Sequence, residues 1–261
     1  MPSPYSYSSL SKFDTCPQYY AHTYVWKTPI PEDTQLDLAM TCGSVVHSVL
    51  EWAHTQTMEN KSLSWTQVEE TLPLKWNAIL AEAGLPFMRE ELPAFIQKSA
   101  DTTKWYFDTI LHAEKEATIG IEKKLLYPLD PPKKRWIIGF LDRISQPHET
   151  KIVIHDYKTG SKKLSEKSLA TDFQATLYGA MAAHAYSPLS EIELRWHYLA
   201  HQKTVKTILD PEQARNTIQK AQRIATQIED HKNVGLFPPK VGWMCTRCEF
   251  KPVCPAHNTR G

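Results

Sequence analysis

The sequence predicts an α/β fold in which helices flank a central mixed sheet. Helical periodicity dominates the chain up to about residue 118, and segments rich in Ile, Val, Leu and aromatic residues begin only after it. The order of elements is helices, three strands, a helix, two strands and a last helix. Because strands and helices alternate in the second half, we expect them to share one core.

The first half of the chain contains four predicted helices. A serine-capped helix opens it, with apolar residues at helical spacing: Leu10, Phe13, Cys16, Tyr20 and Tyr24. After a polar loop over roughly 28–38, the segment 42–56 carries an apolar stripe that consists of Val46, Val49, Leu50 and Ala53. Two further helices, 65–83 and 93–118, are separated by a Gly-Leu-Pro break. We therefore predict one domain over 1–261 with a helical insertion or subdomain at 55–118.

Five strands and two helices are predicted in the second half. The strands are 121–129, 136–145, 151–159, 191–200 and 203–210. A helix at 170–186 separates the third strand from the fourth. A long amphipathic helix follows the fifth strand, with Asp210 as its N-cap and Pro211 at its first position.

Acidic residues end the predicted apolar faces of two neighbouring strands. Alternation places Ile138, Phe140 and Asp142 on one face of 136–145, and it places Ile152, Ile154, Asp156 and Lys158 on one face of 151–159. A polar turn joins these strands into a hairpin, so the two aspartates are expected about 5 Å apart.

Such a pair of carboxylates favours a metal site. Facing carboxylates repel unless a cation lies between them, and hard oxygen ligands suit magnesium or manganese. Lys158 is then placed to orient a water molecule or to offset charge on a phosphate. The alternative interpretation is an ion pair between Asp142 and Lys158 at a sheet edge, and the hairpin alone leaves both interpretations open.

The composition is that of a globular protein without a membrane span. The chain has 261 residues, of which 41% are hydrophobic and 23% charged. No apolar run approaches the roughly 18 residues of a transmembrane helix, and the start lacks the pattern of a secretory signal. Five cysteines without an export signal favour reduced thiols and metal binding, so we expect a cytoplasmic protein. The net charge of +1 neither requires nor excludes a nucleic-acid partner.

Three cysteines gather near the C-terminus in the segment MCTRCEFKPVC. They are Cys245, Cys248 and Cys254. A zinc ion or an iron–sulfur cluster usually takes four protein ligands, and thiolates select either group. A fourth ligand is therefore expected elsewhere in the chain.

An ordered set of motifs resembles the RecB-like branch of the PD-(D/E)XK nuclease superfamily. The matching residues, in chain order, are Gly43, His47, Asp142, Asp156, Lys158, Gln174 and Tyr178. The opening SSLSKFDTCPQYY and the late Cys-x-x-Cys-x(5)-Cys spacing are similar to those of the AddB C-terminal nuclease and of CRISPR-associated RecB-like nucleases. The resemblance covers both ends and the middle of the chain, and no motif matches between about 55 and 115.

The resemblance implies a fold and a metal site. The fold is a restriction-endonuclease-like mixed sheet flanked by helices, with a helical insertion and a C-terminal iron–sulfur module. The implied ligands of a magnesium or manganese ion are His47, Asp142, Asp156 and the carbonyl of Tyr157. Lys158 matches the catalytic lysine, and Gln174 and Tyr178 match residues that position the substrate or this lysine.

The resemblance also implies the missing fourth thiol ligand. Cys16 would be the fourth ligand beside Cys245, Cys248 and Cys254, and the four thiolates would bind a [4Fe–4S] cluster. The C-terminal part of this cysteine module spans 240–261. Tetrahedral zinc in place of the cluster is the alternative, and His257 could replace one cysteine in such a zinc site. Cys42 is then expected to be a buried thiol beside a turn at Gly43.

We therefore expect a metal-dependent DNA nuclease. The activity that we favour is that of an exonuclease that acts on single-stranded DNA ends in recombination, repair or CRISPR adaptation. The helical block over 60–118 would cover the site and guide a strand past stacking aromatic residues. A helicase or CRISPR adaptation proteins are the expected partners. Two alternatives stay open: a non-catalytic DNA-end-binding subunit of a helicase or adaptation complex, and a zinc-binding interaction protein whose acids form surface pairs.

Overall fold

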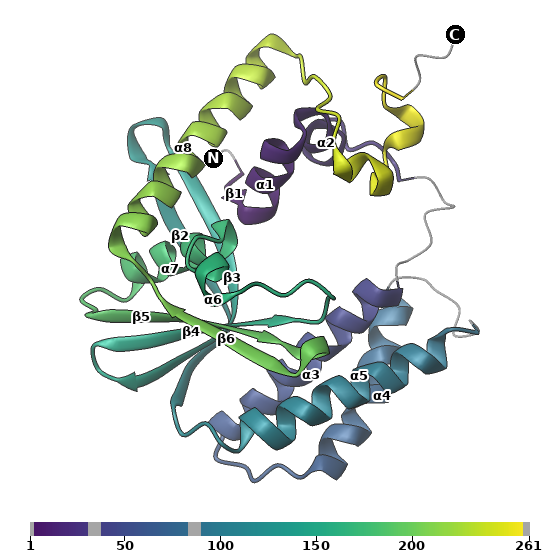
Figure 1. Cartoon of the computed structure of the whole chain (residues 1–261), viewed down its shortest axis with the longest axis vertical. Coiled ribbons are helices and arrows are strands. Elements are labelled where there is room, and N and C mark those ends of the chain that lie inside the picture. The colour runs from purple at the N-terminus through teal and green to yellow at the C-terminus, as the bar shows by residue number, and fades with distance from the viewer. Residues whose placement is uncertain (1–2, 31–37, 83–89, 258–261) are drawn as a thin grey trace. The chain divides into compact units, whose positions relative to one another are not determined.

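The computed structural model (Figure 1) describes residues 3–30, 38–82 and 90–257. Most of the loop predicted over roughly 28–38 and the whole Gly-Leu-Pro break lie outside the described residues. The chain divides into two units. Unit 1 comprises Met1–Gln35, Leu126–Gly139 and Ala214–Gly261, and unit 2 comprises Leu36–Leu125 and Phe140–Gln213. The prediction of one domain with an insertion at 55–118 stays a prediction.

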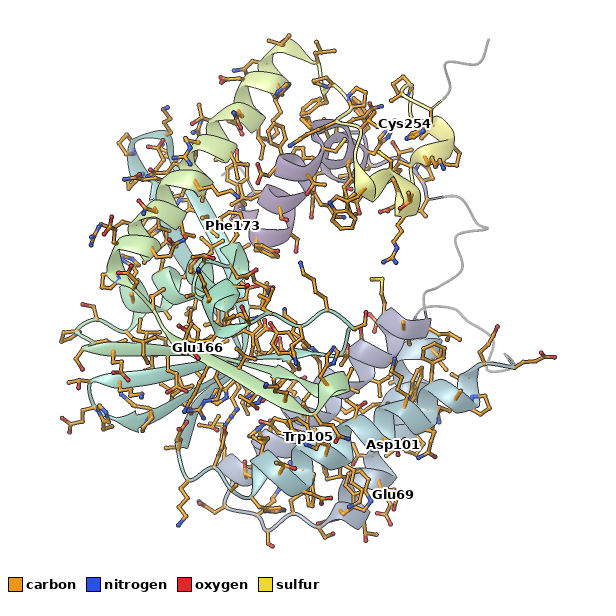
Figure 2. All side chains as sticks on the ribbon, in the orientation of Figure 1. Glu69, Asp101, Trp105, Glu166, Phe173 and Cys254 are labelled. Atoms are coloured by element: carbon orange, nitrogen blue, oxygen red, sulfur yellow. The ribbon has the colours of Figure 1, made fainter. Side chains whose placement is uncertain are left out.

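Three helices form one layer of unit 2. They are α3 (Leu38–Met58), α4 (Trp65–Glu82) and α5 (Leu92–Tyr106), the last of which continues into a π-helical turn over Phe107–Leu111. The stripe predicted on α3 is buried, since its four side chains are at most 1% exposed. Trp105 packs against this core from α5, while Glu69 and Asp101 are exposed on α4 and α5 (Figure 2).

The helix predicted over 93–118 was wrong at its C-terminal end. Helical geometry ends at Leu111, and Ala117 already begins a strand. Thr118, Ile119 and Ile121 are β-branched residues, which favour strands. The helix is therefore shorter than the sequence pattern predicted.

The sheet is mixed, as predicted. Its long strands are β2 (Ala117–Asp130), β3 (Arg135–His148), β4 (Lys151–Lys158), β5 (Glu191–Tyr198) and β6 (Lys203–Ile208). In unit 2, β3 pairs antiparallel with β4, β4 pairs parallel with β5, and β5 pairs antiparallel with β6. β2 pairs with β3, and both strands pass from one unit into the other. The predicted α/β fold with a mixed central sheet flanked by helices is confirmed.

Alternation along β4 sends neighbouring side chains to opposite faces of the sheet. The Tyr157 ring joins the core formed with α3, α4 and α5. Asp156 and Lys158 instead contact Gln174 of α7 (Phe173–Ala185), which Asp172 caps by accepting a 3.0 Å hydrogen bond from the amide of Ala175. The short helix α6 (Glu166–Leu169) precedes α7. Both faces of β4 are therefore covered.

The apolar face predicted for β3 is not the face that is buried. Phe140, on the face that carries Asp142, is 51% exposed, whereas Ile137 and Leu141 on the other face are at most 1% exposed. Apolar residues occupy both faces of this strand, so the sequence pattern contains no preference between them.

Unit 1 begins with β1 (Tyr5–Ser6), which pairs in parallel with β3. Ser6 and Ser9 form a capping box at the start of α1 (Tyr7–Thr15). The helix predicted to run on through Tyr24 is interrupted at Cys16, which has extended backbone angles before Pro17. A residue before proline is disfavoured in helical conformation, which explains the interruption. The chain continues through α2 (Pro17–Tyr20) and a π-helical turn over Ala21–Val25.

A long helix and two short turns complete the described chain. Helix α8 (Pro211–Val234) starts as predicted, and the amide of Glu212 donates a 3.0 Å hydrogen bond to Asp210. Short 3₁₀ turns at Trp243–Arg247 and Lys251–Val253 follow in unit 1. No helix among the described residues is long and apolar enough to cross a membrane.

Candidate metal centre

The β3–β4 hairpin brings the two predicted aspartates together. Arg143 pairs with His155, so the same register places Asp142 opposite Asp156 at the next position. The amide of Tyr157 donates a 2.8 Å hydrogen bond to Oδ2 of Asp142, which fixes that carboxylate against β4. Asp156 is 4% exposed. Two acids thus meet where the hairpin faces little solvent.

Helix α3 adds His47 to this hairpin. Nε2 of His47 donates a 2.7 Å hydrogen bond to the carbonyl of Tyr157, and Nδ1 lies 3.5 Å from Oδ1 of Asp142. One turn earlier, a Cβ atom on Gly43 would lie only 2.8 Å from Oγ1 of Thr159. The two residues of the Gly-x-x-x-His motif therefore have different roles. The glycine permits the close approach of α3 to the end of β4, and the histidine contacts Tyr157 and Asp142. Gly43 lies inside α3, so the turn expected at this position was wrong.

A third acid, Glu122, completes the group, and the sequence analysis missed it. Its carboxylate lies within 4.8 Å of the donor atoms of His47 and Asp142. One hard cation with ligands at about 2.1 Å holds opposite donors about 4.2 Å apart, so this group fits a single ion. Glu122 is exposed on β2 and has a φ of 43°, which is uncommon for a residue other than glycine. No motif marks this position in the sequence.

An open pocket of about 620 Å³ lies over this group. His47, Glu51 and Glu122 line it, together with Gly43 and Thr159. The pocket is wide enough for a ligand larger than an ion, because small-molecule sites occupy about 300–1,000 Å³. The His47 and Glu122 side chains of the group are therefore open to solvent through this pocket.

Lys158 lies beside the metal group and pairs with Asp156 rather than with Asp142. Its Nζ is 2.7 Å from Oδ2 of Asp156 and donates a 2.9 Å hydrogen bond to Oε1 of Gln174. Gln174 in turn donates from Nε2 to Oδ1 of Asp156 at 3.3 Å. Tyr178, one turn later on α7, interacts with Gln174. The predicted lysine, glutamine and tyrosine are thus in one place, and the role of Asp156 as a metal ligand stays a prediction.

The charges in this site favour a cation. Burial raises the pKa of Asp156 above its ordinary value, with Asp142 adding to the rise and Lys158 opposing it. Burial disfavours the charged form of His47, but Asp142 and Asp156 outweigh it and raise its pKa to about 9. The imidazolium of His47 therefore supplies positive charge beside the acids, and it would have to release a proton before one of its ring nitrogens could bind a metal ion.

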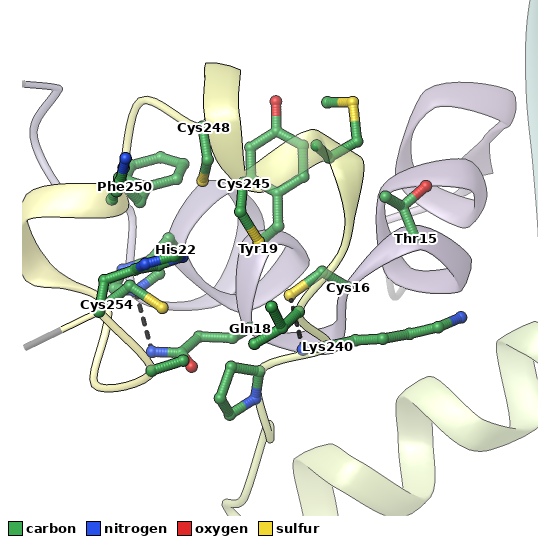
Figure 3. A pocket seen from close by; sticks show the side chains of 16 residues that line it. Thr15, Cys16, Gln18, Tyr19, His22, Lys240, Cys245, Cys248, Phe250 and Cys254 are labelled. Atoms are coloured by element: carbon green, nitrogen blue, oxygen red, sulfur yellow. Dashed lines mark hydrogen bonds between the residues drawn. The ribbon is translucent and has the colours of Figure 1, made fainter. Parts of the chain in front are cut away.

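The four predicted cysteine ligands line one pocket in unit 1 (Figure 3). All four are free thiols. The amide of Lys240 donates to Sγ of Cys16 at 3.3 Å, and the amide of Gly242 donates to Sγ of Cys245 at 3.4 Å. His257, the alternative zinc ligand, also lines this pocket. Residues from both ends of the described chain therefore meet here.

The spacing of these thiols is wider than a single zinc ion needs. Among the described residues, no three cysteine sulfur atoms lie within 4.8 Å of one another. Zinc at about 2.3 Å from each thiolate would hold the sulfur atoms about 3.8 Å apart.

The fifth thiol, Cys42, is 3% exposed inside α3, as predicted, and burial raises its pKa.

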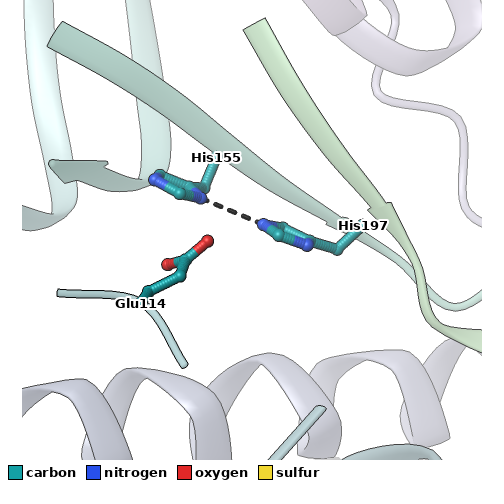
Figure 4. A group of neighbouring side chains, drawn as sticks. All are labelled: Glu114, His155 and His197. Carbon is teal, nitrogen blue, oxygen red and sulfur yellow. Dashed lines mark hydrogen bonds between the residues drawn. The ribbon is translucent and has the colours of Figure 1, made fainter. Parts of the chain in front are cut away.

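A second group of two histidines and an acid lies in unit 2, where guanidinium groups already pair with the acid. It consists of Glu114, His155 and His197 (Figure 4). The guanidinium of Arg143 already contacts Glu114 and donates a 2.7 Å hydrogen bond to Nδ1 of His155. Burial lowers the pKa of both histidines well below the ordinary value, so they are neutral. The cluster ties β3, β4 and β5 together.

Comparisons with known proteins agree with this geometry. A family model described as the PD-(D/E)XK nuclease superfamily matches residues 4–255. A search of curated proteins finds no significant match. The crystal structure of a protein described as "Putative exonuclease" from Eubacterium rectale has 10% sequence identity and a TM-score of 0.58, and the match covers 94% of this chain and 86% of that one. At this identity the likeness shows the fold alone. The structure of SSO0001 has 14% identity over 81% of this chain and 98% of that one, and its TM-score of 0.38 is too low to carry an argument.

Proposed function

Because the chain belongs to the PD-(D/E)XK nuclease superfamily, we propose that it is a DNA nuclease that hydrolyses phosphodiester bonds with a magnesium or manganese ion. The observation that carries this proposal is the meeting of His47, Glu122 and Asp142 beside a lysine that is already oriented. The superfamily expected from the motifs is confirmed, whereas the RecB-like or AddB-like subtype belongs to the proposal.

The proposed ligands of the ion are His47, Glu122, Asp142 and the carbonyl of Tyr157, with Asp156 as a further acid. A bound magnesium or manganese ion would act as a Lewis acid and lower the pKa of a bound water. The protein positions its own groups around that ion. The amide of Tyr157 holds the Asp142 carboxylate, and α3 holds the imidazole of His47.

Lys158 is proposed as the catalytic lysine. Gln174 accepts a hydrogen bond from its ammonium group and Asp156 lies 2.7 Å away, so this group is held before substrate arrives. A preorganised donor of this kind stabilises negative charge as it develops on the phosphate, without reorganising during the reaction. Gln174 and Tyr178 are positioning residues, because they act through Lys158.

Single-stranded DNA ends are the proposed substrate. This choice, the cytoplasmic location and the partnership with a helicase or with CRISPR adaptation proteins rest on the resemblance to RecB-like nucleases. An end-labelled linear strand and a circular strand of the same sequence separate the activities. We expect manganese-dependent loss of the linear strand, a stable circle, and no reaction with a chelator. Binding to ends without cleavage of either strand would favour the non-catalytic DNA-end-binding alternative.

A [4Fe–4S] cluster on Cys16, Cys245, Cys248 and Cys254 is the proposed second cofactor. The shared pocket and the amide donors to two of the sulfur atoms support it. Protein purified without oxygen should be brown and contain iron and sulfide. Colourless protein with one zinc per chain would contradict the cluster and leave the nuclease proposal intact.

A further inference from the structure

A basic groove of about 770 Å³ lies in unit 1 and shares no residue with the metal centre. One acidic side chain, Glu229, lines it. The basic side chains that line it are Lys27, Lys133, Lys134, Arg135 and Lys232. We call this pocket the basic groove.

The acid of the basic groove does not neutralise it. Glu229 accepts a hydrogen bond from the hydroxyl of Tyr5 and lies 3.3 Å from Nζ of Lys232. Arg135 and Lys133 form loose ion pairs with Asp130, at 3.7 and 3.9 Å. Among the ion pairs of the described residues, none includes Lys27 or Lys134. An excess of positive charge therefore faces the groove.

Two of these lysines occupy an unusual backbone conformation. Lys27 has a φ of 49° and Lys134 a φ of 52°, in the left-handed region that favours glycine. Lys27 follows the π-helical turn, and Lys134 lies in the turn between β2 and β3. Glycine would satisfy the backbone at both positions with less strain. What lysine adds there is a charged side chain, and both charges line the same groove.

Aromatic rings accompany the charges. Tyr24 and Trp136 line the basic groove, and each is 39% exposed. Proteins that bind single strands combine a basic groove, which follows the phosphates, with exposed aromatic rings on which the bases stack. An acidic peptide would use the lysines but would leave these rings without a matching partner.

We propose that the basic groove is a binding site for a short segment of single-stranded nucleic acid, with phosphates on Lys27 and Lys134 and a base on Trp136. The choice of DNA rests on the proposed function, but binding in this groove needs neither the metal centre nor cleavage.

The test replaces both lysines that have a left-handed backbone conformation by glycine, in the variant Lys27→Gly with Lys134→Gly. Because glycine prefers this conformation, the variant should melt at or above the parent temperature. Each lost phosphate contact on a single strand reduces the slope of log affinity against log salt by about 0.7. We therefore expect the slope to fall by about 1.4, which corresponds to about 25-fold weaker binding at 0.1 M salt.

Binding is measured by fluorescence anisotropy of a labelled oligothymidine with full-length protein and a chelator. Lys203→Ala with Lys206→Ala is the matched control, since it removes two exposed charges of β6 that line neither the basic groove nor the metal pocket. Trp136→Leu should weaken binding on the order of 10-fold without changing the salt slope.

Three outcomes would overturn the proposal: an unchanged slope in the glycine variant, an equal loss in the control variant, or equal competition by polyglutamate of matched charge. The outcomes also separate this inference from the proposed function. Binding that depends on the groove in a protein that never cleaves DNA supports the groove and contradicts the nuclease. A protein that cleaves DNA, and whose DNA binding does not depend on the groove, supports the nuclease and contradicts the groove.

Discussion

Gly43→Ala should slow DNA cleavage without unfolding the protein. The new Cβ would lie 2.8 Å from Oγ1 of Thr159, about 0.6 Å inside the 3.4 Å at which ordinary contact begins. If α3 moves by that amount, His47 moves away from the carbonyl of Tyr157 and from Asp142. A misplacement of about 1 Å costs on the order of 100-fold in rate, so we expect a loss of roughly 10- to 100-fold.

The effect of this substitution on stability has the opposite sign. Alanine is favoured over glycine in a helix interior by about 1 kcal/mol, which offsets part of the steric cost. The melting temperature should therefore change little while the rate falls. A merely destabilising substitution would instead lower both together.

A second substitution tests the steric origin of this loss. In Gly43→Ala with Thr159→Ala, the hydroxyl is gone and the nearest remaining atom of residue 159 lies 3.9 Å from the new Cβ, an ordinary contact. Initial rates on an end-labelled single strand and manganese affinity by calorimetry should both return toward those of Thr159→Ala alone. A Gly43→Ala protein that cleaves at the parent rate, or a double variant without recovery, would refute the approach of α3 as the reason for this glycine.

Three further predictions concern the ligands and the core. Glu122→Gln should weaken manganese binding at least about 10-fold, because the substitution removes one ligand charge. The melting temperature should not change, because the side chain is exposed. Equal manganese affinities of the variant and the parent protein by calorimetry would contradict this prediction. Cys16→Ala should lose bound iron and lower the melting temperature, while Cys42→Ala keeps its iron, and metal analysis of the two variants decides. His155 and His197 have depressed pKa values in the folded state, so below about pH 6.5 the unfolded state binds protons that the folded state does not. For the pair alone, the free energy of unfolding should thus fall with falling pH by up to about 2.7 kcal/mol per pH unit. The raised pKa values of His47 and Asp156 oppose part of this fall, and urea titrations that show higher stability at pH 5.5 than at pH 7 would contradict the prediction.

Local periodicity explains why the elements could be predicted. The apolar stripe of α3 and the apolar run of β4 repeat with the periods of a helix and a strand, and both are buried. The polar turn predicted a hairpin, so Asp142 and Asp156 were expected to be neighbours; a register shift between Ser145 and His148, which the turn did not predict, sets which residues lie opposite each other. The interruption at Cys16 had a local signal as well, namely the proline that follows it.

The parts that could not be predicted depend on tertiary structure. Both faces of β3 are apolar, so burial of Leu141 rather than Phe140 is decided by what packs on the strand. Glu122 joins His47 from a separate strand through a left-handed backbone, and no sequence spacing encodes that meeting. His197 likewise reaches His155 from β5, a strand that lies beside β4 only after folding.

The rate at which Lys158→Ala cleaves an end-labelled single strand, measured beside its melting temperature and manganese affinity, tests the nuclease assignment. Lys158 is held by Asp156 and Gln174 but is not part of the group of metal donors. We predict a rate lower by on the order of 100- to 1,000-fold, with manganese affinity close to that of the parent protein. Asp156→Asn should instead lower manganese affinity as well as the rate. A folded Lys158→Ala protein that cleaves near the parent rate, and that has lost only stability, would reduce this lysine to an ion-pair partner and contradict its catalytic role.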